Sequence, residues 1–234
     1  MVLRRWQSSG VRLAFRFPVF VRADETSQMM TPTHMLVAAG VATRRWMAGG
    51  LIAIAFFSGF LPDLPMLVMV IWARWTGFSG NMWDAPDGLY WSTPWQTAIS
   101  ATHSFPVWGA VFCLGLYLFY RNRGSKWALA LMVLGAGAFV HSLFDFPVHT
   151  SDAHAHFWPF SNWRFISGVS YYEPQHYGNI VSKIEIVIGA AMVVLIFRRF
   201  RSWWVRGFGL FLCLPYVLEL VPREWLFRLH QILF

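Results

Sequence analysis

Long apolar runs, separated by short polar or basic segments, dominate the chain. The longer runs cover residues 46–61, 64–75, 105–120, 127–146, 180–197 and 203–221. A helix that crosses a bilayer needs about 20 mostly apolar residues, so these runs predict an all-α, polytopic membrane bundle with about five or six apolar segments.

Two features interrupt the apolar pattern in the first half of the chain. After Thr31, about ten apolar residues precede Arg44, roughly half of what a span requires. They predict a half-depth helix with His34 in its first turn. Residues 61–65 have the sequence LPDLP, and we expect the two prolines to break the helix and to hold Asp63 at a bend.

The pattern between residues 76 and 179 predicts a helical hairpin flanked in the sequence by two long loops. A basic turn around Arg121 and Lys126 joins the runs 105–120 and 127–146. His103 opens the first of these helices and His141 lies near the end of the second, so both are expected at the end of the hairpin opposite the basic turn. The loops 76–102 and 147–179 are rich in aromatic residues, as is typical of segments at the level of the lipid headgroups.

Composition and charge place these elements in a membrane. Apolar residues make up 56% of the sequence and charged residues only 13%; a soluble protein of this composition would expose too much apolar surface. The net charge of +8 comes largely from arginines at the ends of apolar runs, which favours contact with a lipid bilayer and argues against nucleic-acid binding. We predict one membrane domain over 30–234, with 1–29 as a basic tail or an over-long gene start.

The candidate chemistry lies at the end of the run 127–146. Residues 139–156, FVHSLFDFPVHTSDAHAH, contain four histidines and two aspartates. His141 and Asp145 are four residues apart and share one face of a helix, whereas the other four groups follow Pro147 on a loop. A histidine on an apolar face is more often a hydrogen-bonded core residue. This density of imidazoles and carboxylates nevertheless favours a metal or proton-handling site.

Other helix ends supply further donors, which extends the predicted metal site. Its ligands are drawn from His34, Asp63, His103, His141, Asp145, His149, Asp152 and His156. The surplus of donors allows one or two divalent ions, with Zn²⁺ expected first and Mn or Fe as alternatives. Asp63 or Asp145 would bridge the ions or orient a water.

Roles are less constrained in the loop that follows. Arg164 is predicted to steady a substrate phosphate, with an ordinary interfacial arginine as the alternative. Glu173 and His176 fit a general base, a support for the ligands, or an exposed pair. The role of His154 stays open.

The order of these motifs resembles a known family. Thr33-His34, Leu61-Pro62-Asp63, His103-Ser104 and His141 to Asp145 are similar to motifs of the bacterial inner-membrane, metal-dependent hydrolase family that includes LexA-regulated members. The resemblance covers roughly residues 30–200 and implies a multi-pass inner-membrane hydrolase, but no substrate. Pro65 stands where the family often has a second acid. The order of ligands is also similar to that of zinc phospholipase C and P1-type nucleases, which cleave phosphoesters.

We therefore expect a membrane-bound hydrolase that cleaves a phosphoester, including a lipid-borne one, with metal-activated water. The site is expected on the extracytoplasmic side, because the basic turn favours the cytoplasm. One alternative is a membrane protein that binds or transports a metal or a metal-containing cofactor without hydrolysis. Another is a structural membrane protein whose histidines only cap helices.

Overall fold

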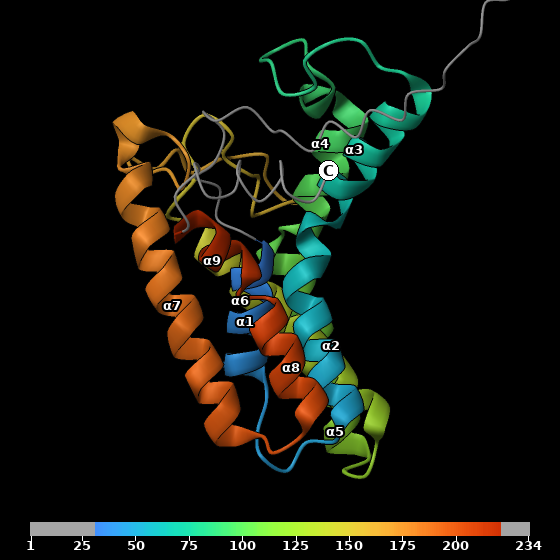
Figure 1. Ribbon diagram of the computed structural model, residues 1–234. Helices are drawn as coiled ribbons and strands as arrows, with labels where there is room; N and C mark the ends of the chain where they lie inside the picture. Colours follow the sequence, from blue (N-terminus) through green and yellow to red (C-terminus); the bar gives the residue numbers. More distant parts are fainter. Residues whose placement is uncertain (1–30, 221–234) are drawn as a thin grey trace, which may run out of the picture.

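The computed structural model describes residues 31–220, and every regular element in that range is a helix (Figure 1). The elements are α1 (Thr31–Ala42), α2 (Gly49–Phe60), η1 (Leu61–Asp63), α3 (Leu64–Thr76), η2 (Leu89–Trp91), α4 (Thr93–Thr102), α5 (Phe105–Arg121), α6 (Lys126–Asp145), η3 (Pro174–His176), α7 (Gly178–Arg199), α8 (Trp203–Phe211) and α9 (Leu214–Leu220). The predicted all-α fold is confirmed. The predicted basic tail at 1–29 lies outside the described residues.

Several of these helices suit a membrane environment. Gly49–Thr76, α6 and α7 are each long and apolar enough to cross a bilayer, and α4 with α5 makes a fourth candidate if the pair, bent by 41°, is one span. The helix α1 has 12 residues, as expected for a half-depth element. The predicted hairpin is present as α5 and α6, which pack along one another.

The prolines of LPDLP change the type of helix without reversing the chain. Residues 61–63 form one 3₁₀ turn, and Gly49–Thr76 continues through it as a single 28-residue candidate span. The predicted break at Asp63 is therefore present between α2 and α3, but the two runs 46–61 and 64–75 together make one candidate span. Pro62 has no N–H, so a carbonyl of the preceding turn loses its usual helical partner.

The last apolar run is divided, in contrast to the prediction of one segment over 203–221. The helix α8 ends at Phe211 and α9 begins at Leu214. Pro215 explains the break, because its ring would clash with the carbonyl of residue 211 in a continuous helix and it has no N–H to donate.

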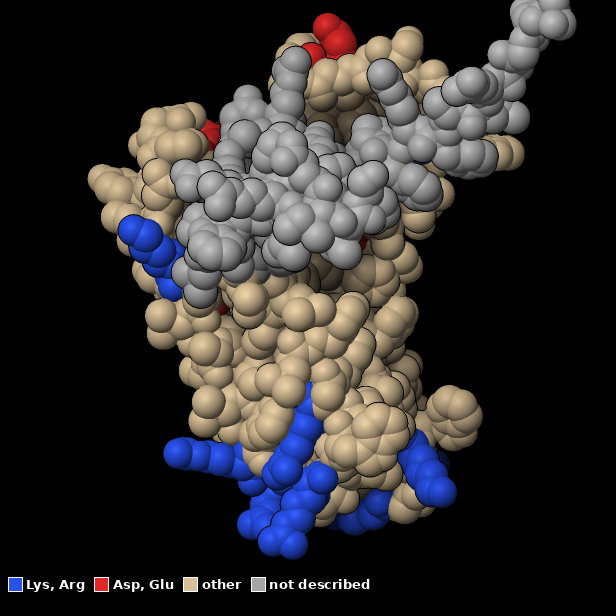
Figure 2. Space-filling view, viewed as in Figure 1, with Lys and Arg blue, Asp and Glu red and all other residues tan. Residues whose placement is uncertain are grey.

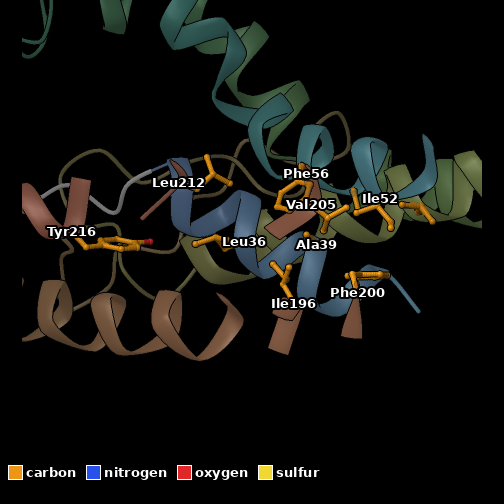
Figure 3. Packing of buried hydrophobic residues seen from close by; sticks show 11 residues of the cluster. Leu36, Ala39, Ile52, Phe56, Ile196, Phe200, Val205, Leu212 and Tyr216 are labelled. Atoms are coloured by element: carbon orange, nitrogen blue, oxygen red, sulfur yellow. The ribbon is translucent and has the colours of Figure 1, made fainter. Parts of the chain in front are cut away.

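The main core lies where α1, α2, α7 and α8 meet. Its buried side chains include Leu36 of α1, Phe56 of α2, Ile196 of α7 and Val205 of α8 (Figure 3). The helices α1 and α2 approach so closely that a Cβ at Gly59 would lie 2.4 Å from the carbonyl oxygen of His34. This contact places His34 beside the end of α2.

Basic side chains gather at one end of the bundle (Figure 2). The loops and helix ends there carry Arg44, Arg45, Arg121, Arg123, Lys126, Arg198, Arg199, Arg201 and Arg206. One of them also has a local role: Nη1 of Arg199 donates to the carbonyls of Gly40 (2.6 Å) and Thr43 (2.8 Å), at the end of α1. The histidines and aspartates lie toward the other end.

Candidate metal centre

Helix ends and junctions bring three histidines around Asp145. Nε2 of His34 lies 3.0 Å from Oδ1 of Asp145. Nε2 of His141 lies 3.0 Å, and Nε2 of His103 3.4 Å, from its other oxygen. All of these side chains are buried. The predicted convergence of α1, α6 and the α4–α5 junction is therefore present.

Asp63, at the η1 turn, joins the same cluster. Its Oδ1 lies 3.5 Å from Nε2 of His141 and 3.8 Å from Nε2 of His103. Its Oδ2 accepts a hydrogen bond from the hydroxyl of Thr31 at 2.6 Å. The side chain of Asp63 is 16% exposed, more than that of Asp145 at 4%.

Backbone carbonyls fix the orientation of two imidazoles. Nδ1 of His141 donates to the carbonyl of Gly59 at 2.7 Å, and Nδ1 of His103 donates to the carbonyl of Ile99 at 2.9 Å. Because a carbonyl only accepts, each Nδ1 carries a proton, and in the neutral ring Nε2 then presents its lone pair to the cluster. Second-shell bonds of this kind orient histidine ligands in metalloproteins.

The inner atoms of the cluster fit a cation. Within the described chain, Nε2 of His103, His141 and His154 is buried and makes no hydrogen bond of good geometry. When these two rings of His103 and His141 are neutral, as metal ligands are, their Nε2 lone pairs face the carboxylate oxygens with no proton between them. A buried polar group left in this way is costly, and a metal ion is the group that such nitrogen and oxygen donors bind together.

Among residues 31–220, three overlapping groups of side chains could hold an ion. They are His34, His141 and Asp145; Asp63, His103 and His141; and His103, Asp145 and His154, with the donor atoms of each group within 4.8 Å of one another. His103, His141 and Asp145 each belong to two groups, so the cluster is compatible with either one ion or two neighbouring ions.

The loop after α6 supplies one member of these groups whose role the sequence left open. His154 packs against His103 with ring centroids 4.2 Å apart. Burial, and then the neighbouring His103, holds the pKa of His154 well below its usual range, so the ring is in the neutral form that binds metals. The pattern of alternating histidines in DAHAH did not indicate which ring faces inward.

His156, predicted as a ligand, has another position. It belongs to none of the three groups; its ring stacks on Phe105 at 5.0 Å, and its Nδ1 donates to the carbonyl of His103 at 2.9 Å. Burial, and then His103, lowers its pKa to about 4. His156 therefore supports the segment that carries His103. The prediction that it coordinates the ion is not supported.

His149 and Asp152 form a pair at the rim of the cluster. Nδ1 of His149 lies 2.9 Å from Oδ2 of Asp152, and its Nε2 lies 3.8 Å from Oδ1 of Asp145. Burial lowers the pKa of His149, but Asp145 and Asp152 outweigh it and raise that pKa to about 10. Asp152, predicted as a ligand, is thus placed to orient His149 and lies outside the three groups.

Arg164 supports the loop from outside the cluster. Its Nη1 donates to the carbonyl of Ala153 at 2.9 Å and its Nη2 donates to Oε1 of Gln96 at 2.8 Å. It therefore fastens the residue before His154 to α4. This position does not favour the predicted contact with a substrate phosphate.

Glu173 and His176 also hold the loop together away from the cluster. The carboxylate of Glu173 accepts from the hydroxyls of Thr150 (2.7 Å) and Ser151 (2.6 Å) and from Nδ1 of His176 (2.8 Å). Burial raises the pKa of Glu173, but these hydrogen bonds outweigh it and lower that pKa to about 2. Glu173 and His176 therefore link the segment at residues 150–151 to the segment at residues 173–176 by hydrogen bonds.

A cavity of about 640 Å³ opens onto the cluster. Its polar wall includes His34, Asp63, Asp145, His149 and His154. Its other walls are aromatic and apolar, with residues from α3 and from the loop 77–92 such as Met66, Leu67, Trp83, Tyr90 and Trp91. The loop predicted as a headgroup-level segment thus contributes to the cavity.

Charge in the cavity is one-sided. Among the described residues that line it, Asp63, Asp145 and Asp152 are acidic and none is Lys or Arg. Tyr90, Tyr171 and Tyr172 add hydroxyl groups. Burial, and then Asp152, raises the pKa of Tyr90, and burial raises that of Tyr172 to about 12, so these hydroxyls keep their protons and act as donors.

Comparisons with known proteins add no relative. No family model, curated protein or solved structure matches the chain. The site is therefore described by its own geometry.

Proposed function

We propose that the protein is a membrane-bound, metal-dependent hydrolase that cleaves a phosphoester with water. The main support is that the buried donor cluster forms one wall of a cavity of about 640 Å³, where a substrate can approach bound ions. A binding site that only stores a metal needs no such space. The motif order supports the same proposal through its resemblance to membrane hydrolases.

The charge of the cavity favours a phosphoester once ions are present. The acidic wall alone would repel a phosphate, and no lining Lys or Arg compensates for it within the described chain. Divalent ions held by the cluster would supply Lewis-acid chemistry, polarising a phosphoryl oxygen and making water acidic enough to attack near neutral pH. Zn²⁺ is the ion that we favour, because the donors are imidazoles and carboxylates in overlapping groups.

The two helix-borne aspartates suit different tasks. Asp145 is buried and both of its oxygens face histidine nitrogens, which suits a ligand shared between ions. Asp63 is more exposed, lines the cavity and is held at Oδ2 by Thr31. We assign to Asp63 the orientation of the attacking water and the acceptance of its proton.

Neutral hydroxyls can hold the substrate. Tyr90, Tyr171 and Tyr172 lie on the cavity wall beside Ser151. As protonated donors they can bind phosphate oxygens, which is the task that the sequence suggested for Arg164. Hydrogen bonds to an ionised acceptor are among the stronger ones.

The proposed location is the bacterial inner membrane, with the site on the extracytoplasmic side. The support is that the basic residues gather at the opposite end of the bundle (Figure 2), as cytoplasmic ends do.

The test combines metal analysis with a panel of phosphomonoesters and phosphodiesters on detergent-purified protein. We expect stoichiometric metal, and hydrolysis that is lost with a chelator and restored by Zn²⁺. His141→Ala should lose both metal and hydrolysis. His176→Ala is the matched control, because this histidine lies outside the ligand groups. Unchanged turnover and metal content in His141→Ala would refute the proposal, and bound metal without hydrolysis would favour a binding or transport protein.

A further inference from the structure

A second apolar hollow lies beside the metal centre. This groove, between α2 and α8, has a volume of about 590 Å³ and is lined by Met35, Ala53, Phe56, Phe57, Phe60, Trp203, Trp204, Gly207, Phe208 and Phe211. No charged residue lines it among the described residues. In Figure 1, α8 lies beside α2, and the rings of Phe56 and Phe208 meet edge to face at 5.0 Å.

The groove and the cavity share a wall. Phe60 lines both, and it is the last residue of α2 before the turn that carries Asp63. Met35 lines the groove, whereas its neighbour His34 lines the cavity. A molecule that extends past Phe60 would therefore have a polar end at the donor cluster and an apolar end against α2 and α8.

The dimensions of the groove match an acyl chain. From Trp203 to Phe211, α8 extends about 12 Å at 1.5 Å per residue. The hydrocarbon layer of one leaflet, half of the bilayer core, is roughly 15 Å deep. The edges of the groove are apolar and exposed, with Phe57, Trp203 and Phe211 at 46%, 84% and 60%, as suits a surface that faces lipid.

We infer that the substrate is a lipid with a phosphate-ester headgroup, whose headgroup enters the cavity and whose acyl chain lies in the α2–α8 groove, with Phe60 between them. This inference rests on the proposed function, since it names the substrate class of the same site. It adds a binding surface that the ligand cluster alone does not define.

Two glycines provide a matched pair of variants. A Cβ at Gly207, in the groove, meets no atom of residues 31–220 within 4 Å, and the same holds for Gly109 of α5, which lines neither hollow. Leucine is a better helix former than glycine, so both substitutions are compatible with folding. Gly207→Leu places a side chain in the groove, and Gly109→Leu places one elsewhere on the bundle.

The first measurement is independent of hydrolysis. Palmitoyl phosphatidic acid with a diazirine in its acyl chain is photo-crosslinked to the protein in nanodiscs with the metal removed, and the labelled peptides are mapped by mass spectrometry. We expect the labelled peptides to come from α2 and α8. In Gly207→Leu the labelling should decrease roughly tenfold, because the new side chain excludes about two methylene groups of the acyl chain from the groove. Gly109→Leu should label as the wild type does.

The second measurement separates this inference from the proposed function. With metal bound, Gly207→Leu should decrease kcat/KM for the long-chain lipid roughly tenfold and leave that for p-nitrophenyl phosphate at the value of Gly109→Leu. Labels confined to α3, or equal labelling in the two variants, would overturn the inference even if p-nitrophenyl phosphate is cleaved. If neither ester is cleaved, the hydrolase proposal fails, while the crosslinks still decide whether a lipid occupies the groove.

Discussion

The candidate metal centre has two halves that are held in different ways. The helix-borne half, defined as His34, Asp63, His103, His141 and Asp145, is oriented mainly by backbone: the carbonyls of Ile99 and Gly59 fix two of its rings. The loop-borne half, defined as His149, Asp152, His154 and His156, depends on side chains and loop contacts such as Asp152 on His149. From this difference we expect the helix-borne half to determine whether metal binds and the loop-borne half to adjust the affinity.

The largest effect should come from the residue that both halves share. Asp145 faces His34, His103 and His141 from α6, and also His149 from the loop. Asp145→Asn should abolish stoichiometric metal and decrease hydrolysis by about 1,000-fold, the equivalent of about 4 kcal/mol of lost transition-state stabilisation. Metal analysis and initial rates measure both. Asp87→Asn, in an exposed turn, is the control; full metal content in Asp145→Asn would contradict the assignment.

A comparison of two neighbouring histidines tests the loop-borne half. His154→Ala removes a member of a ligand group and should weaken metal binding by at least about 100-fold, since the loss of a group that only orients a ligand already costs up to that much. His156→Phe keeps a ring beside Phe105 and loses only the bond to the carbonyl of His103, so its effect should be smaller. Competition with a chelating dye measures the affinities. The reverse order would place His156, and not His154, at the ion.

A smaller effect is expected at the rim. Asp152→Asn keeps the size of the side chain but removes the charge that faces Nδ1 of His149. We expect metal affinity to fall by roughly tenfold, the lower end of the range for such supporting groups. The same dye competition measures it. A loss as complete as that of Asp145→Asn would show that Asp152 binds the ion directly.

The smallest effect concerns stability and not metal binding. Glu173→Gln weakens the hydrogen bonds to Thr150, Ser151 and His176. The free energy of unfolding should fall by about 1 kcal/mol at neutral pH, the usual contribution of a partly exposed, hydrogen-bonded charge. The pKa of Glu173 is about 2 in the folded protein against an ordinary 4.5. Its contribution is therefore complete above pH 4.5 and is lost as the pH falls toward 2.

Thermal unfolding in detergent, followed at neutral pH and at decreasing pH, checks this dependence. The gap between wild type and Glu173→Gln should close as the carboxylate takes up its proton. A gap that is constant with pH would show that the charge of Glu173 does not matter. Metal content should be equal in both proteins at neutral pH.

The sequence alone determined most of the helix-borne half. Apolar runs of membrane length fix helices, and a spacing of four fixes His141 and Asp145 on one face. The prolines and polar residues at the ends of the apolar runs placed Asp63 at a helix break and His103 at a helix start. These signals are local, because the helix period sets side-chain directions within a few residues. The break at Asp63 was located, but the joining of α2 and α3 into one candidate span was not, since a proline pair does not determine how far the chain bends.

Only the tertiary structure decided which loop residues reach the donor cluster. The direction of a loop side chain depends on contacts from distant segments: Phe105 N–H donates to the carbonyl of His156 at 2.8 Å, and Ser167 N–H to that of His149 at 2.9 Å. These bonds turn His154 inward and His156 toward Phe105. No spacing in DAHAH encodes them. The cavity and the groove likewise exist only where separate helices pack, so neither has a signature in the chain.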